Sequence, residues 1–260
     1  MDFEILTAWL KANKISLNAS KTEILIFRNP KKPLNYDLKL KLDGHRLYQS
    51  KYVKYLGVLI DPYLRWDYHI KTLAPKLSRA VGMLAKMRHF LTTEILRNLY
   101  FGIFYSIMTY GAQVWGQHNN AHVRRISKLN DKAIRIMNFA KYHDDPSEHY
   151  KNLNILKFQD IIKLNNYLYI HDHFNLNLPT SLLDNFKFIK TSHNHNTRIS
   201  GANCVELPKS NTLEYGIHSV FGQASRHWNH FQVILNDSKL HTLSKYSCKE
   251  LISKHLMNSY

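Results

Sequence analysis

The chain has 260 residues, 44% of them apolar, which is enough for a sizeable core and excludes a globally disordered protein. No run of about 18 apolar residues occurs, so we expect no membrane span, and the absence of a signal peptide predicts a nuclear or cytoplasmic protein. The formal net charge is +17, and its surplus lies in residues 62–142, with 13 basic and 3 acidic side chains. This excess favours a polyanionic partner, although charge that only aids solubility is the alternative.

The first 61 residues carry strand and turn signals around one short helix. Phe3 to Asn13 has helical spacing, and 21–27 has the composition of a strand. The alternation around Leu38, Leu40 and Leu42, followed by Asp43-Gly44, predicts a hairpin whose second strand is 45–49. The stretch 53–60 is rich in β-branched and aromatic residues, which predicts one buried strand with Gly57 at a close approach.

From Trp66 onward the apolar period becomes helical. Ile70, Leu73, Leu77, Val81 and Leu84 line one face of a helix that Pro75 should kink or interrupt. Further helices are expected at 94–108, apolar nearly all round and buried, and at 120–140. Later helices are expected at 160–174, 213–228 and 247–257. The expected fold class is therefore α+β, with a small antiparallel sheet at the N-terminus followed by helices.

The helix at 120–140 carries basic residues on one side. At about 100° per residue, five cations fall within roughly a quarter turn of each other, and only Asp131 lies near them. They are Arg124, Arg125, Lys128, Lys132 and Arg135. This pattern predicts a phosphate-facing surface, with an ordinary solvated face as the alternative.

Two other patterns suggest metal chemistry at first sight. His171/His173, His193/His195 and His227/His230 are close pairs, but no cysteine or carboxylate stands at a known ligand spacing, and Cys204 and Cys248 give no metal motif. Tyr142-His143-Asp144-Asp145 has the Tyr-x-Asp-Asp form of a two-metal hairpin. It follows a helix and runs into Pro146, so we interpret it as a turn at the end of a helix.

Several motifs together resemble the polymerases of non-LTR (LINE, jockey-like) retrotransposons. The segments that carry the resemblance are Trp9-Leu10, Leu17-Asn18-Ala19-Ser20-Lys21-Thr22, 54–61, Trp66, His69-Ile70, Tyr110-Gly111, Val114-Trp115-Gly116, 132–135, Thr197-Arg198, Leu207-Pro208, Tyr215-Gly216 and Trp228-Asn229. The first two resemble a reverse-transcriptase palm segment that follows the catalytic hairpin, and 54–61 resembles the primer grip. No single motif is decisive, but their order and spacing match over essentially the whole chain.

The resemblance implies a set of roles. Residues 1–61 would be the end of a palm with a primer-grip-like strand, 62–142 a basic helical thumb, and 143–260 a helical C-terminal extension. Lys21 would lie near the departing pyrophosphate, and Tyr55, Leu56 and Gly57 beside the primer 3′ end. Lys71, Arg79 and Lys86, with the five cations at 124–135, would hold an RNA/DNA template–primer duplex by its phosphates.

The family's catalytic carboxylates lie in palm segments upstream of the one that Trp9 matches. We therefore expect a truncated RNA-directed DNA polymerase that is inactive alone. We expect no cofactor in this chain, because the upstream palm would bind the Mg²⁺. That upstream palm is a further expected partner. The alternatives are a free-standing, non-catalytic nucleic-acid-binding module and an inactive expressed remnant.

Overall fold

The computed structural model describes residues 2–16, 18, 21–32, 40–42, 45–117, 120–182, 185–189, 203–235 and 242–260. The chain forms two compact units, Met1–Thr72 and Leu73–Tyr260. The predictions for Leu38, the turn Asp43-Gly44, the pair His193/His195 and Thr197-Arg198 lie outside the described residues.

The N-terminal unit combines one helix with two short antiparallel ladders. Helix α1 (Asp2–Ala12) precedes strands β1 (Lys41–Leu42) and β2 (His45–Arg46), which pair with Leu42 opposite His45. Strands β3 (Val53–Tyr55) and β4 (Val58–Ile60) form the second ladder. A small antiparallel sheet followed by helices confirms the predicted α+β class.

The prediction of one buried strand over 53–60 is wrong. The chain turns back at Leu56-Gly57, and Tyr55 pairs with Val58 across a two-residue loop. Both loop residues have positive φ, 45° for Leu56 and 84° for Gly57, as a hairpin turn that follows the twist of its strands requires. Gly57 is therefore a turn glycine, and Tyr55 and Leu56 are 63% and 71% exposed.

Two more predictions for the N-terminal unit, the strand at 21–27 and the helix at its start, are only partly matched by the structure. Residues 21–27 form no regular strand, and their ladder contact is a single parallel bridge between Ile24 and Gln49. Helix α1 exists as predicted, but its apolar side chains Leu6 and Trp9 are about half exposed. Apolar spacing indicated the helix correctly and did not indicate how deeply it is buried.

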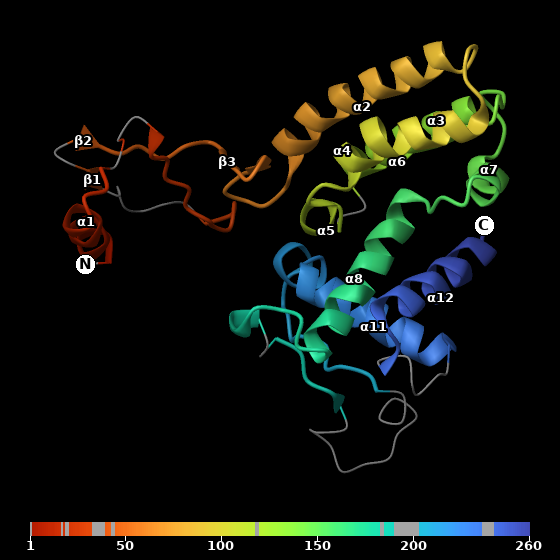
Figure 1. Cartoon of the computed structure of the whole chain (residues 1–260). Coiled ribbons are helices and arrows are strands. Elements are labelled where there is room, and N and C mark those ends of the chain that lie inside the picture. Colours follow the sequence, from red (N-terminus) through yellow and green to blue (C-terminus); the bar gives the residue numbers. More distant parts are fainter. Residues whose placement is uncertain are drawn as a thin grey trace. The chain divides into compact units, whose positions relative to one another are not determined.

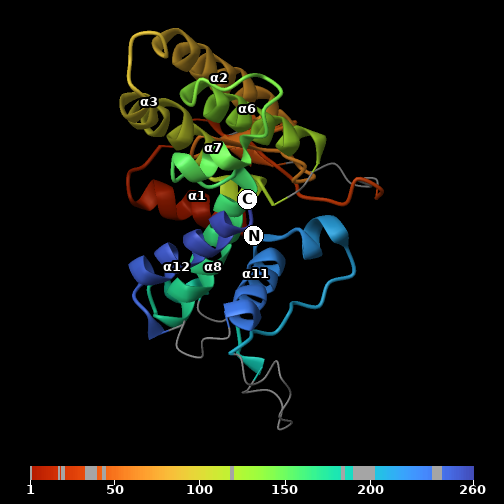
Figure 2. The same cartoon turned by 90° about the vertical axis from the view of Figure 1, so that its right-hand side faces the viewer.

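The remaining elements are helical (Figure 1). The longer helices form two groups. Helices α2, α3 and α6 lie beside one another in the first group, and α8, α11 and α12 lie beside one another in the second, in both views (Figures 1 and 2). The elements are α2 (Asp67–Met87), α3 (Thr93–Tyr100), the π-helix η2 (Phe101–Tyr105), α4 (Ser106–Thr109), α5 (Ala112–Trp115), α6 (Ala121–Met137), α7 (Pro146–Asn152), α8 (Phe158–Phe174), the 3₁₀ turn η3 (Thr180–Leu182), the π-helix η4 (Leu213–Ile217), α11 (Val220–Leu235) and α12 (Lys245–Asn258).

Helix α2 follows its predicted pattern. The five apolar residues Ile70, Leu73, Leu77, Val81 and Leu84 are all buried. The expected interruption at Pro75 does not occur, because the helix runs through it from Asp67 to Met87.

The helix predicted over 94–108 is amphipathic rather than buried all round. It is built from α3, η2 and α4 in succession, and its buried side chains recur every four residues at Leu96, Tyr100, Phe104 and Met108. Ile95, by contrast, is 49% exposed. Apolar composition overstated the burial of this segment.

The C-terminal core lies between α8, α11 and α12. Its centre is aromatic, with the ring of Tyr167 stacked on Trp228 at 4.5 Å and edge-on to Phe231 at 5.8 Å. The predicted helix at 213–228 is divided, because η4 ends at Ile217 and α11 begins at Val220. The helices predicted at 160–174 and 247–257 correspond to α8 and α12.

Gly116 is held in a site that has no room for a side chain. A Cβ added there would lie 2.5 Å from Cδ1 of Ile162 and 2.6 Å from the carbonyl oxygen of Ala112. We expect Gly116→Ala to destabilise the protein by about 1–3 kcal/mol through overpacking. Gly82 on α2 has no atom near such a Cβ, so Gly82→Ala should stabilise the helix by about 0.5–1 kcal/mol. Urea unfolding gives the free energy of unfolding of each variant. Equal changes in the two variants would contradict the tight packing around Gly116.

Among the described residues, no helix has both the length and the hydropathy needed to cross a lipid bilayer.

Candidate nucleic-acid interface

One face of helix α6 is anchored in the core, which fixes the direction in which its opposite face points. Asn120 caps the helix by accepting a hydrogen bond from the backbone N–H of Val123 at 2.9 Å. On the inner face the hydroxyl of Tyr100 donates to Oδ1 of fully buried Asn130 at 2.7 Å. Burial raises the pKa of Tyr100 well above its usual value, so the hydroxyl stays a donor. The helix is thus tied to α3.

The outer face of α6 presents cations at a regular spacing. Arg124, Lys128 and Lys132 are exposed and stand four residues apart, about 6 Å along the helix axis at each step. Arg125 is exposed beside them. We call Arg124, Lys128 and Lys132 the α6 stripe. Within the described part of the chain, Lys128 and Lys132 form no ion pair with a carboxylate.

The one acidic residue of α6, Asp131, is already engaged. Asp131 accepts a hydrogen bond from the hydroxyl of Tyr150 on α7 at 2.8 Å. Burial raises the pKa of the Asp131 carboxyl, an effect that the Tyr150 hydrogen bond and the charge of Arg135 partly offset. Asp131 therefore contributes to the contact between α6 and α7.

Arg135 differs from the other four predicted cations of this helix. Its side chain is half-buried, and Nε donates to the backbone carbonyl of Asp144 at 2.8 Å. It thus holds the loop after α6.

The segment Tyr142-His143-Asp144-Asp145 is a turn between α6 and α7, as interpreted from the sequence. Asp144 accepts a hydrogen bond from the backbone N–H of Lys141 at 2.7 Å. Asp145 caps α7 by accepting from the backbone and hydroxyl of Ser147, and these hydrogen bonds lower its pKa. Both carboxylates have structural roles here.

The predicted cations of α2 lie on its exposed side. Lys71, Arg79 and Lys86 are all exposed, and helical geometry places them within about 80° of each other. Nζ of Lys71 lies 5.9 Å from the centre of the Tyr68 ring.

The predicted primer-grip residues lie at the tip of the β3–β4 hairpin. Tyr55 ends β3, and Leu56 and Gly57 form the turn. Lys21 is exposed and lies at the start of the extended segment 21–27, where its backbone N–H donates to the carbonyl of Asn18 at 3.1 Å. All four residues are accessible from solvent.

Sequence reasoning missed the residue that joins this hairpin to α2. Asp61 is 3% exposed, and its two carboxylate oxygens accept from the backbone N–H groups of Tyr63, Arg65 and Trp66 at 2.9–3.0 Å. The N–H of Leu59 donates to Nδ1 of His69 at 3.3 Å. The signal in the sequence was Asp61-Pro62 just before a helix, a typical site for a side chain that accepts backbone hydrogen bonds.

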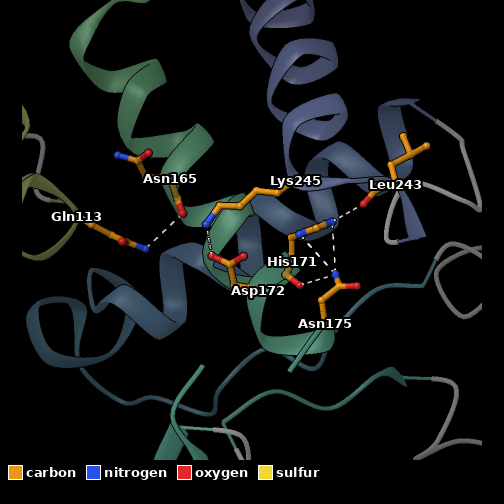
Figure 3. Close-up of polar contacts among 7 residues, drawn as sticks. All are labelled: Gln113, Asn165, His171, Asp172, Asn175, Leu243 and Lys245. Carbon is orange, nitrogen blue, oxygen red and sulfur yellow. Dashed lines mark hydrogen bonds and ion pairs between the residues drawn. The ribbon is translucent and has the colours of Figure 1, made fainter. Parts of the chain in front are cut away.

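Histidines from two of the predicted pairs, His171/His173 and His227/His230, are used in packing, and Figure 3 shows one of them, His171. His171 lies 2.8 Å from the carbonyl oxygen of Leu243, and His173 lies 3.2 Å from that of Phe186. His227 lies 3.0 Å from Nδ2 of Asn166, and burial followed by the nearby positive charge of Lys163 lowers its pKa to about 4. Among the described residues, no group of three or more His, Cys, Asp and Glu could hold a metal ion.

Two of the motifs that carry the resemblance, Val114-Trp115-Gly116 and Trp228-Asn229, have structural roles. The ring of Trp115 stacks on Phe158 at 5.5 Å, beside the tightly packed Gly116. Asn229 pairs with the backbone of Val205 through both its amide oxygen and its amide nitrogen, at 2.8 and 2.9 Å.

Two proteins of Drosophila melanogaster are similar to this chain. One, described as a probable RNA-directed DNA polymerase from transposon BS, is 26% identical over 153 residues, which cover 58% of this chain and 17% of that protein. The other, a probable RNA-directed DNA polymerase from transposon X-element, is 25% identical over 171 residues, which cover 63% and 18%. No family model matches the chain, and no solved structure matches it. The chain thus matches less than a fifth of the length of either relative, and these matches support a relationship to the RNA-directed DNA polymerases of transposons.

Proposed function

We propose that this chain holds an RNA/DNA template–primer duplex by its phosphates, as a non-catalytic part of an RNA-directed DNA polymerase. The observation that carries the proposal is the α6 stripe, three exposed cations at four-residue spacing on a helix whose opposite face is fixed in the core. Cations so arranged neutralise phosphates without reading the base sequence. The similarity to the transposon polymerases makes an RNA/DNA hybrid the expected duplex.

The other predicted residues have places in this proposal. Arg125, Arg79, Lys86 and Lys71 would add phosphate contacts. Tyr55, Leu56 and Gly57, at an exposed hairpin tip, would lie against the primer 3′ end. By the resemblance Lys21 would donate a proton to the departing pyrophosphate in the complete polymerase, and an upstream palm would supply the carboxylates for Mg²⁺.

Filter binding and primer extension on the same preparation test the proposal. The 260-residue chain should retain a labelled RNA/DNA hybrid at low salt and release it as salt rises. With a primed RNA template, Mg²⁺ and all four deoxynucleotides, it should add no nucleotide, because phosphoryl transfer needs placed metal ions. Absence of binding at low salt would contradict the duplex-holding role, and clear incorporation would contradict the non-catalytic role.

A further inference from the structure

The N-terminal unit contains a cavity that none of the predicted site residues lines. Its volume is about 300 Å³. Two cations, two tyrosines, a serine and an aspartate are among the side chains around it: Arg28, Lys51, Tyr63, Tyr68, Ser50 and Asp61. Its lining therefore combines positive charge with aromatic rings.

Arg28 is fixed by its neighbours without being neutralised. Its Nη2 donates to the hydroxyl of Tyr63 at 2.8 Å, and its Nη1 donates to the carbonyl of Lys32 at 3.2 Å. The guanidinium carbon also lies 5.3 Å from the centre of the Tyr63 ring. These contacts are with neutral groups. In the described part of the chain, no carboxylate forms an ion pair with Arg28 or with the exposed Lys51.

Asp61, the acidic residue in the lining, does not neutralise Arg28 or Lys51 through an ion pair. The oxygens of Asp61 already accept three backbone hydrogen bonds. A second carboxylate, that of Glu23, lies outside the lining, is exposed, and accepts from the Ser50 hydroxyl at 3.4 Å, a long contact. The cavity therefore favours an anion.

An aromatic platform adjoins the cavity. Tyr68 is 44% exposed, and its ring centre lies 5.0 Å from that of Tyr52, itself 43% exposed. Exposed aromatic rings beside a basic groove are the usual means by which proteins hold unpaired bases, since each base has a face that can stack.

We propose that this cavity binds the phosphate of a nucleotide in a single-stranded nucleic acid, with the adjoining base stacked on Tyr52 and Tyr68. Arg28 and Lys51 would contact the phosphate. The volume is at the lower limit for small-molecule sites, which suits one nucleotide and not a duplex. A duplex keeps its bases paired and stacked, so it offers no free base to the platform. This site is independent of the proposed duplex-holding function of the α6 stripe.

The test uses fluorescence anisotropy with a labelled ten-nucleotide single strand. All proteins carry Arg124→Gln, Lys128→Gln and Lys132→Gln, so that binding to the α6 stripe does not contribute. Adding Tyr68→Leu should weaken binding roughly tenfold, within the range found for lost stacking on an aromatic ring. Adding Lys51→Gln removes a charged contact with the phosphate and should weaken binding by about the same factor. The matched control is Lys41→Gln, which removes an exposed lysine of β1 outside the cavity and should change the affinity less than about twofold.

Competition identifies the source of the phosphate. Unlabelled single strand should displace the probe at much lower concentration than adenosine monophosphate or inorganic pyrophosphate. Equal displacement by either small molecule would overturn the assignment to a strand. Equal affinities of the Lys51→Gln and Lys41→Gln proteins would overturn the cavity as the site. Neither result would bear on duplex binding, which the α6 stripe variants test separately.

Discussion

Reversing the charges of the α6 stripe, with Arg124→Glu, Lys128→Glu and Lys132→Glu together, is expected to weaken binding of an RNA/DNA hybrid on the order of 100-fold or more at low salt. Three attractive contacts with phosphates become repulsive in this variant. The side chains are exposed, so folding should change little. Filter binding gives the affinity, and circular dichroism with thermal unfolding confirms that the helices remain.

A control with the same change in net charge separates the stripe from the general basicity of the protein. Lys209, Lys249 and Lys254 are exposed and lie outside α2 and α6. Changing all three to Glu lowers the formal charge by the same six units. This variant should lose far less affinity, through long-range attraction alone. Equal losses in the two triple variants would show that binding does not depend on α6.

Asp61→Ala is expected to have the largest effect on the stability of the N-terminal unit. The substitution leaves three backbone N–H groups without their acceptor in a turn where Leu64 and Trp66 already have positive φ, 51° and 65°. The loss should be roughly 3 kcal/mol or more, because each unsatisfied buried donor costs about 1–3 kcal/mol. Hydrogen exchange should show early loss of protection at the amides of Tyr63, Arg65 and Trp66.

Two further variants test the cause of that loss. Asp61→Asn keeps one acceptor oxygen and should be intermediate between wild type and Asp61→Ala. Glu23→Gln changes an exposed carboxylate of the same unit and should alter stability by less than about 0.5 kcal/mol. Unchanged amide protection in Asp61→Ala would mean that the turn holds its shape without the carboxylate.

Periodicity predicted the helices of this protein well because most of them bury one face. The apolar face of α2 was identified residue by residue, and the exposed α6 stripe was predicted from the same helical spacing. Burial was harder to predict, since the segment 94–108 is apolar on nearly all sides and yet buries one line of side chains, Leu96, Tyr100, Phe104 and Met108. The apolar pattern of a helix does not indicate how many of its sides are covered by other elements of the fold.

The N-terminal unit was less predictable for a different reason. β-Branched and aromatic residues favour strand, but they do not mark where a strand reverses when the turn is Leu-Gly instead of Asn-Gly. Leu56 adopts a positive φ that few leucines adopt, so 53–60 had the pattern of a single strand. The cavity beside Arg28 brings together residues from 28 to 68, and no local pattern reveals such an assembly.

The salt dependence of hybrid binding tests the central claim most directly. The logarithm of the association constant is measured against the logarithm of the salt concentration for wild type and for a neutral variant, Arg124→Gln, Lys128→Gln and Lys132→Gln. Because each neutralised phosphate contributes a slope of about −0.9, the variant should lose roughly three units of slope. Equal slopes for the two proteins would contradict the claim that the α6 stripe holds the phosphates of the duplex.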